Sequence, residues 1–278
     1  MELSRLAEHR QVRRLLYVAG PAIVWAATLV LGTGYVALRS LGATTFPWND
    51  GSSIEQALFH VDAPRFLQSH IYAHNLEWFD FLGFLLHLSW FFLPVAFGLL
   101  ITLFERRRMM EYFAWLLVGT YIACAMFVVL PVTPPWMEPG VTRILAARSF
   151  VEYTQMDVNP VAAFPSLHAG TPMMIALFLL IRCKRVRWAG YVAMGFTLAI
   201  SFAVVYLGEH WIMDVLAGWA LAGGVAVLFT STGVRSAIHA IPGDPLAIVL
   251  SLDRLLNERS VVAEPRASLE VGTEAEAA

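Results

Sequence analysis

The sequence predicts an all-α integral membrane protein with six transmembrane helices, both chain ends in the cytoplasm and interfacial amphipathic helices in the first outer loop. Apolar residues make up 58% of the 278 residues and charged residues only 14%, whereas soluble domains contain about one half and about one quarter. The mean hydropathy is +0.63. Six apolar stretches are long enough to cross a bilayer, and arginine and lysine gather on one side of them.

The first expected span runs from about residue 15 to residue 38, after a polar start that contains Arg5, Arg10, Arg13 and Arg14. This apolar run is too long for the core of a signal peptide and lacks a convincing cleavage site, so we expect no cleavable signal. Between residues 39 and 78, charged and aromatic residues interrupt the apolar pattern. Short amphipathic helices at the membrane surface are predicted there by the spacing of Leu58, Phe59, Asp62 and Phe66.

The other five expected spans lie at about 79–104, 112–130, 165–182, 188–207 and 211–230. A proline-rich loop, 131–163, separates the third span from the fourth. We therefore expect one catalytic membrane domain over residues 1–241, with its core motifs within 131–214. The run Pro242-Gly243 breaks the chain, and residues 242–278 are expected to form a cytoplasmic amphipathic helix and a disordered acidic tail.

The placement of basic residues predicts the orientation, because cytoplasmic loops are enriched in Lys and Arg. With six spans, all but four of the 19 Lys and Arg residues fall on one side of the membrane. The four exceptions are Arg39, Arg65, Arg143 and Arg148. Both chain ends are then cytoplasmic, and the first outer loop and the proline-rich loop share the extracytoplasmic face. No basic-aromatic patch suggests nucleic-acid binding, and Cys124 and Cys183 lie at different expected depths, which disfavours a disulfide.

His210 and Asp214 form the first candidate catalytic pair. Residues four apart are neighbours on a helix, and a carboxylate beside one imidazole nitrogen fixes the tautomer and makes the other nitrogen a better nucleophile or base. Ionisable groups within membrane spans are more often functional than not. A polar pair that joins two helices is the structural alternative.

His168 and Ser166 form the second candidate group, at the start of the fourth span. Pro165 sets the entry to a helix and Ser166 can cap it or donate to an anion. Free backbone N–H groups at a helix start bind phosphate readily, and His168 would face such an anion. Simple capping by Ser166 is the alternative. In the expected topology, both histidine motifs reach the same outer surface.

Together the motifs Pro165-Ser166-Leu167-His168 and His210-x3-Asp214 resemble the type 2 phosphatidic acid phosphatase superfamily of membrane lipid phosphatases and phosphotransferases. The resemblance covers roughly residues 80–230. It implies that His210 attacks phosphorus to form a phosphohistidine, that Asp214 orients His210, and that His168 protonates the leaving oxygen and then activates water or an acceptor hydroxyl. Such a division of roles suits phosphoryl transfer.

The sequence also departs from the superfamily pattern. The first motif, Lys-x6-Arg-Pro, is missing, Val204 stands where a third-motif arginine is expected, and Leu167 replaces a glycine. The run Pro131-Val132-Thr133-Pro134-Pro135-Trp136 takes the place of the first motif. It resembles the inositol phosphorylceramide synthase-like (inositolphosphotransferase) branch, which implies a phosphotransferase or a bacterial relative of one.

Loss of the usual cations leaves the phosphate-binding residues open. Arg143 and Arg148 are the preferred candidates because their loop leads into the second motif, with Arg65 and Arg39 as further outer-face candidates. Each has the alternative of meeting lipid phosphates at the interface. Other candidate substrate-binding groups are the hydroxyls of Ser166 and Tyr206 and the ring of Trp136, which also fits an aromatic belt.

Other histidines give weaker signals. His70 and His74 have a spacing that suits a metal, but no third ligand is fixed nearby, so we expect no metal site and no cofactor. His87 lies within the second span and is a minor candidate for the active site. Glu209 can tune His210 or simply meet water.

Lipid phosphotransfer at the extracytoplasmic face of a bacterial plasma membrane is thus the leading prediction, with a lipid phosphate or phospholipid as substrate and membrane lipids as surroundings. Simple hydrolysis of a lipid phosphate is the first alternative. A metal-dependent intramembrane hydrolase that uses His168, His210 and Asp214 as ligands is a second, and a non-enzymatic lipid transporter is a third. The sequence leaves the donor, the acceptor and the oligomeric state open.

Overall fold

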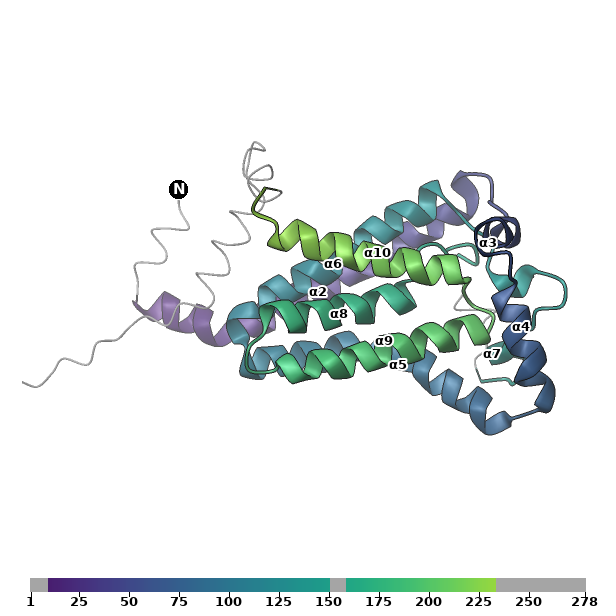
Figure 1. Cartoon of the computed structure of the whole chain (residues 1–278). Coiled ribbons are helices and arrows are strands. Elements are labelled where there is room, and N and C mark those ends of the chain that lie inside the picture. Colours follow the sequence, from purple (N-terminus) through teal and green to yellow (C-terminus); the bar gives the residue numbers. More distant parts are fainter. Residues whose placement is uncertain (1–9, 151–158, 234–278) are drawn as a thin grey trace, which may run out of the picture.

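A computed structural model of the chain describes residues 10–150 and 159–233, and within these ranges all regular structure is helical. Six long helices lie side by side, and the shorter helices α3, α4 and α7 gather at one end of them (Figure 1). The long helices are α2 Arg10–Thr45, α5 Glu77–Phe104, α6 Met109–Val129, α8 Leu167–Arg182, α9 Arg187–Tyr206 and α10 Ile212–Thr230. The expected all-α class is confirmed.

Five of the long helices are long and apolar enough to cross a membrane, namely α2, α5, α6, α9 and α10. The remaining one, α8, has 16 residues, which corresponds to a length of about 24 Å. The sequence places the start of this span at Pro165, but Ser166 has an extended conformation and caps the helix instead. Within the described residues, the structure therefore identifies five candidate spans and one shorter apolar helix packed among them.

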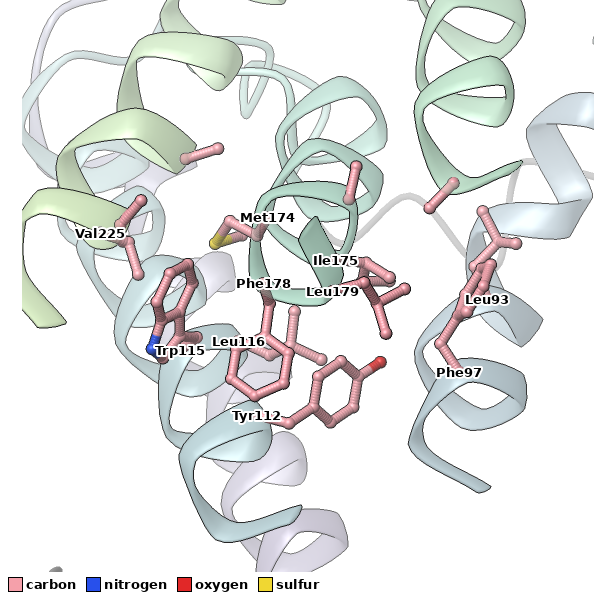
Figure 2. Close-up of a cluster of buried hydrophobic side chains, with 14 of the residues drawn as sticks. Leu93, Phe97, Tyr112, Trp115, Leu116, Met174, Ile175, Phe178, Leu179 and Val225 are labelled. Carbon is pink, nitrogen blue, oxygen red and sulfur yellow. The ribbon is translucent and has the colours of Figure 1, made fainter. Parts of the chain in front are cut away.

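The core forms where α8 packs against α5, α6 and α10 (Figure 2). Phe178 of α8 lies edge-on to Tyr112 and Trp115 of α6, and Met174 is fully buried. Close approach of the backbones depends on small residues. A Cβ at Gly119 would lie 2.3 Å from the sulfur of Met174. Thus α8 is enclosed by other helices rather than exposed along its length.

The first long helix, α2, lies against α6 and exposes most of its candidate span, Ala19–Leu41. Hydrogen bonds to α6 and α5 help to hold it in place. The Tyr121 hydroxyl donates to the Leu31 carbonyl oxygen at 2.6 Å, and the Trp25 Nε1–H donates to the Thr102 hydroxyl at 3.3 Å. A large apolar exposed surface on a long helix is expected where lipid takes the place of protein contacts.

The short elements of the first predicted outer loop are α3 Gly51–Phe59, α4 Ala63–His70 and the 3-10 helix η1 Tyr72–His74. His60 ends α3 in the left-handed conformation, with φ 56°. Asp62 then caps α4 by accepting the Arg65 N–H at 3.1 Å. The predicted short helices exist, but Asp62 lies between two of them rather than on the face of one.

The proline-rich loop adds the 3-10 helix η3 Pro135–Met137 and the one-turn helix α7 Ile144–Ala147. Gln68 of α4 joins this loop to α9, because its amide donates to the Thr142 and Tyr206 carbonyl oxygens at 2.8 and 3.0 Å and its carbonyl accepts the Thr142 N–H at 2.8 Å. The loop is thereby fixed across the end of the bundle.

The far end of the bundle carries basic residues in two short turns, between α5 and α6 and between α8 and α9. Glu105 accepts the backbone N–H groups of Lys184 and Arg185 at 2.9 and 2.7 Å, and Glu111 accepts from Arg182 at 3.1 Å. These contacts join the two turns. The predicted C-terminal helix and acidic tail, 242–278, and the predicted domain boundary lie outside the described residues.

Candidate active site

His168 and His210 come together at the end of the bundle that carries α3, α4 and α7. His168 lies in the first turn of α8, and His210 lies in the turn between α9 and α10. The His168 Nδ1 and the His210 Nε2 are 3.1 Å apart. One of these nitrogens must carry the proton of that hydrogen bond. The two motifs therefore form one site, as the sequence predicts.

Asp214 lies behind His210 and is completely buried. Its Oδ2 is 3.4 Å from the His210 Nδ1 and accepts the backbone N–H of Trp211 at 2.8 Å. The contact with His210 is within ion-pair distance but does not have hydrogen-bond geometry, and among the described residues His210 Nδ1 and Asp214 Oδ1 have no hydrogen-bond partner. Catalytic hydrogen bonds are often long in a ligand-free site and tighten when substrate binds.

This arrangement favours one pair of tautomers. A proton on the His210 Nδ1 faces the Asp214 carboxylate, which leaves a lone pair on the His210 Nε2. The His168 Nδ1–H then donates to that lone pair. The unprotonated Nε2 is a nucleophilic nitrogen, and the adjacent His168 carries a transferable proton.

Local backbone contacts fix both histidines. The Ser166 hydroxyl accepts the Ala169 N–H at 3.3 Å and caps α8, while the Ser166 N–H donates to the Asp214 carbonyl oxygen at 2.9 Å. Ser166 is completely buried, and its hydroxyl does not line the cavity described below. The structure therefore supports the capping alternative for Ser166.

A tight turn between α9 and α10 positions His210 in the site. Gly208 has φ +81°, and a Cβ there would lie 2.8 Å from the Thr142 carbonyl oxygen, so this position requires glycine. The Gly208 carbonyl oxygen accepts the Trp136 N–H at 3.0 Å. The proline-rich loop is thus hydrogen-bonded to the residue two before His210.

A cavity of about 480 Å³ opens onto both His168 and His210. Its lining combines polar and apolar side chains. The polar lining residues include Arg39, His87, Arg143, Asn159, His168, Glu209 and His210. The apolar lining residues include Phe84, Leu88, Trp90, Phe91, Phe127 and Phe150. This combination suits an amphiphile whose head meets the histidines.

Of the predicted cations, Arg143 and Arg39 line the cavity, whereas Arg148 and Arg65 do not. The Arg143 Nε and Nη2 donate to the two Glu209 carboxylate oxygens at 2.9 and 3.0 Å. Its guanidinium also lies 4.3 Å above the centroid of the Trp136 ring, a cation–π contact. Trp136 lines the cavity as well, so two predicted substrate-binding residues reach the site together.

Arg148 and Tyr206 belong to a different cluster. The Arg148 Nε donates to Asp80 at 2.7 Å and its Nη2 donates to the Asn75 side chain at 2.7 Å. The Tyr206 hydroxyl donates to the other Asp80 oxygen. This network joins α7, α5 and α9 and satisfies a completely buried carboxylate. The geometry gives Arg148 and Tyr206 a structural role, because neither lines the cavity.

Two aromatic side chains of α5 lie against His168: His87, a minor candidate in the sequence, and Trp90, which sequence reasoning did not single out. The His87 ring stacks on the His168 ring, with centroids 4.4 Å apart. Trp90, one turn further along α5, lies 4.9 Å from the His168 centroid and donates its Nε1–H to the Leu167 carbonyl oxygen at 2.8 Å. The i, i+3 spacing of His87 and Trp90 placed both on one face of α5 and was the available signal.

His70 and His74 do not form a metal site with a third residue. Among the described residues, no group of three or more His, Cys, Asp and Glu side chains is arranged to hold a metal ion. The His70 Nδ1 instead lies 2.8 Å from the Phe66 carbonyl oxygen.

Comparison with known protein families shows to which family the chain belongs. A family model described as the PAP2 superfamily matches residues 52–228. The chain belongs to the PAP2 superfamily. The match to the PAP2 superfamily begins within α3 and continues into α10, so it contains His168, His210, Asp214 and Arg143, whereas Arg39 lies before it.

Within the PAP2 superfamily, the chain is similar to the inositol phosphorylceramide synthase catalytic subunit aur1 of Schizosaccharomyces pombe. The two are 36% identical over 111 residues, which cover 33% of this chain and 26% of the relative. The similarity therefore extends over about a quarter of the relative's length. It supports the synthase-like branch that the proline-rich motif indicates. No solved structure matches the chain.

Proposed function

We propose that this PAP2 superfamily protein transfers a phosphoryl or substituted phosphoryl group from a phospholipid-type donor through a phosphohistidine on His210. The 3.1 Å contact between the His168 Nδ1 and the His210 Nε2 in the wall of an amphiphilic cavity carries this proposal. It supplies a nucleophilic nitrogen and a proton donor in one place, which the first half-reaction requires.

In the first half-reaction, the His210 Nε2 attacks phosphorus while the bond from phosphorus to the leaving oxygen breaks. His168 enters this step as the doubly protonated imidazolium, gives its Nδ1 proton to that oxygen and becomes neutral. Asp214 stabilises the positive charge that develops on the His210 ring. In the second half-reaction, the acceptor O–H gives its proton to His168 as its oxygen attacks phosphorus, and the P–N bond breaks. His168 and His210 return to their starting states.

Arg143 is the preferred cation for the transferred group. The phosphoryl oxygens need positive hydrogen-bond donors, and a guanidinium matches their geometry. Arg143 lines the cavity beside His210 and is held by Glu209, whereas Arg148 is committed to Asp80. Arg39, which also lines the cavity, is a second candidate.

We further propose six membrane crossings, with α8 as the short one, and a site on the extracytoplasmic face. The arginine and lysine distribution supports this orientation, because the turns around Arg107 and Lys184 lie at the end of the bundle away from the histidines. The shortness of α8 is compatible with a crossing, since its start lies in a protein-lined cavity rather than in lipid.

Transfer and hydrolysis share the first half-reaction and differ only in the acceptor. Similarity to a synthase catalytic subunit and the absence of the phosphatase-type Lys and Arg motif favour transfer to an alcohol. Hydrolysis of a lipid phosphate is the second candidate, because a phosphohistidine that meets water is hydrolysed.

The decisive experiment traps the covalent intermediate. Purified protein is mixed with phospholipid donors that carry a labelled phosphoryl group, quenched in alkali and analysed for acid-labile label on histidine. We expect label on the wild-type protein and none on His210→Ala, and addition of an alcohol acceptor should move the label into a new lipid. Absence of label from the wild-type protein with every donor class would contradict the proposal.

The same preparation separates the other function classes. A metal-dependent hydrolase loses activity with a chelator, whereas the phosphohistidine route is insensitive to chelators and is inhibited by vanadate, which mimics five-coordinate phosphorus. A non-enzymatic lipid transporter retains its function in His210→Ala. Full turnover of phosphorylated lipids by His210→Ala would disprove the nucleophile assignment.

A further inference from the structure

Glu55 is a buried carboxylate that the proposed mechanism does not use. It lies on α3, far from both motifs in sequence, and its exposed fraction is 1%. Its Oε1 accepts the Ile212 N–H at 3.1 Å and its Oε2 accepts the Met213 N–H at 3.0 Å. Among the described ion pairs, none involves Glu55. A carboxylate this deeply buried is costly unless it is well hydrogen-bonded, and its partner here is the start of α10.

The position of these two N–H groups connects Glu55 to the catalytic dyad. They follow directly after His210 and Trp211 and belong to the first turn of α10, where free N–H groups and the helix dipole attract negative charge. The preceding N–H, that of Trp211, is already bound by Asp214 at 2.8 Å. Three consecutive N–H groups are thus shared between two carboxylates.

Without Glu55, the N–H groups of Ile212 and Met213 would lose their hydrogen-bond partner, which is costly for donors removed from water. Asp214 is the next carboxylate on the same turn, and its Oδ1 has no hydrogen-bond partner among the described residues. Asp214 would therefore rotate towards the backbone and away from the His210 Nδ1, which it approaches at only 3.4 Å. Because Glu55 already binds these two N–H groups, they do not draw the Asp214 carboxylate away from His210.

Close packing around the first residue of α3 holds this helix in a fixed position against the start of α10. The Gly51 N–H donates to the Thr133 hydroxyl at 3.0 Å, and the Trp211 indole N–H donates to the Thr133 carbonyl oxygen at 2.8 Å. A Cβ at Gly51 would lie 2.3 Å from the Trp211 Nε1. The start of α3, the proline-rich loop and the residue after His210 therefore meet without space between them.

We propose that Glu55 is a positioning residue: it clamps the start of α10 to α3 and keeps Asp214 available to His210. This inference rests on the proposed function for its kinetic consequence, since it takes His210 as the nucleophile. Burial raises the pKa of Glu55, and the N–H groups of Met213 and Ile212 act to lower it, so the charged form depends on these two bonds.

Phosphoenzyme formation in Glu55→Gln tests the kinetic part. The amide has nearly the same volume but turns an NH2 group towards one of the two N–H donors. We expect the rate of phosphoenzyme formation to fall about 100-fold, the size of effect that a small misplacement of catalytic groups produces, with KM and the unfolding temperature little changed. The control is Gln56→Ala on the exposed face of the same helix, which should match the wild type.

A double-mutant cycle shows whether Glu55 acts through Asp214. If it does, Glu55→Gln has little further effect on the rate in an Asp214→Asn background, because residues that act as a unit are not additive. Independent, additive losses would overturn the proposal. So would a Glu55→Gln variant that forms phosphoenzyme at the wild-type rate.

Nitrogen-15 NMR of the histidine side chains gives a readout without turnover. Loss of the Asp214 contact should shift the His210 signals in both Glu55→Gln and Glu55→Ala, and Gln56→Ala should leave them in place. Unchanged His210 signals in folded Glu55 variants would contradict the clamp. If the wild-type protein forms no phosphoenzyme, the proposed function fails, and these spectra still decide whether Glu55 positions His210.

Discussion

Arg143 and Arg148 illustrate how residues of one type, five positions apart, acquire different roles. Arg143 has two hydrogen bonds to Glu209, stacks on Trp136 and lines the cavity. Arg148 binds the buried carboxylate of Asp80 and lies outside the cavity lining. Nothing in their local sequence separates them. Their partners are 66 and 68 residues away along the chain, and only those partners decide which arginine lines the cavity.

This difference predicts opposite outcomes for one matched pair of variants. Arg143→Lys keeps the charge but loses the paired hydrogen bonds of the guanidinium, so we expect kcat/KM to fall about 100-fold with little change in unfolding temperature. Arg148→Lys should preserve kcat/KM and lower the unfolding temperature. Steady-state kinetics and thermal denaturation measure both quantities. If Arg143→Lys lowers only the unfolding temperature and Arg148→Lys lowers only kcat/KM, the two roles are the reverse of those we assign.

Removal of Arg148 tests the structural cluster directly. In Arg148→Ala, the completely buried Asp80 loses its cation while the Tyr206 hydroxyl remains, and a buried carboxylate left without its cation is destabilising. We expect a clear loss of stability in denaturant titrations. The double variant Arg148→Ala with Asp80→Asn should recover part of it, because no uncompensated charge is then buried. Equal stability of Arg148→Ala and the wild type would show that the cluster contributes nothing.

At the scale of elements, the site depends on how closely α8 approaches α10. A Cβ at Gly218 of α10 would lie 2.3 Å from the Ser166 carbonyl oxygen and 3.1 Å from the Gly170 nitrogen. Both contacts are to backbone atoms, which cannot move without shifting the helix. Ser166 and Asp214 are joined by a backbone hydrogen bond of 2.9 Å between the same two segments. This approach sets the separation of His168 and His210.

Gly218→Ala should therefore reduce phosphoenzyme formation by more than tenfold, because α8 and α10 must move apart. Gly223 and Gly224, on the same helix, have nothing within 4 Å of the position a Cβ would take. Replacing either by alanine should leave activity intact and stabilise the helix by about 0.8 kcal/mol. Activity of Gly218→Ala at the wild-type level would show that this contact does not determine how closely α8 must approach α10 for activity.

At the scale of the whole molecule, the proposed orientation places the histidines outside and the basic turns inside. Native cysteines do not interfere with a labelling test. Cys124 and Cys183 are buried, and burial, followed by the nearby Glu105 carboxylate, raises the pKa of Cys183 to about 12. The reactive species is the thiolate, so Cys183 stays protonated and unreactive at neutral pH.

Single cysteines on exposed positions report the topology. Ala73→Cys, in η1, should react with a membrane-impermeant maleimide in intact cells, whereas Arg107→Cys should react only after the membrane is opened. The unmodified chain is the control and should stay unlabelled. If Arg107→Cys reacts in intact cells and Ala73→Cys does not, the orientation is the reverse of the one proposed.

The sequence by itself determined the all-α membrane class, the approximate helix positions and the three catalytic candidates. These follow from short-range physics: apolar runs of bilayer length, a capped helix start at Ser166, and the i, i+4 spacing of His210 and Asp214. The family resemblance carried by the same residues is confirmed by the PAP2 superfamily match over residues 52–228. Whether α8 crosses the membrane, and which face the site occupies, remain predictions.

Only the tertiary structure decided which polar groups surround those histidines. In the folded chain, Arg143, His87 and Arg39 line the cavity, whereas Arg148 and Tyr206 donate hydrogen bonds to Asp80. It also placed Glu55 on N–H groups 157 and 158 residues away. Contacts over such separations depend on how whole helices pack, and neither residue type nor local spacing records that packing. The proposed nucleophile, His210, is therefore readable in the sequence, whereas the groups that surround it in the structure are not.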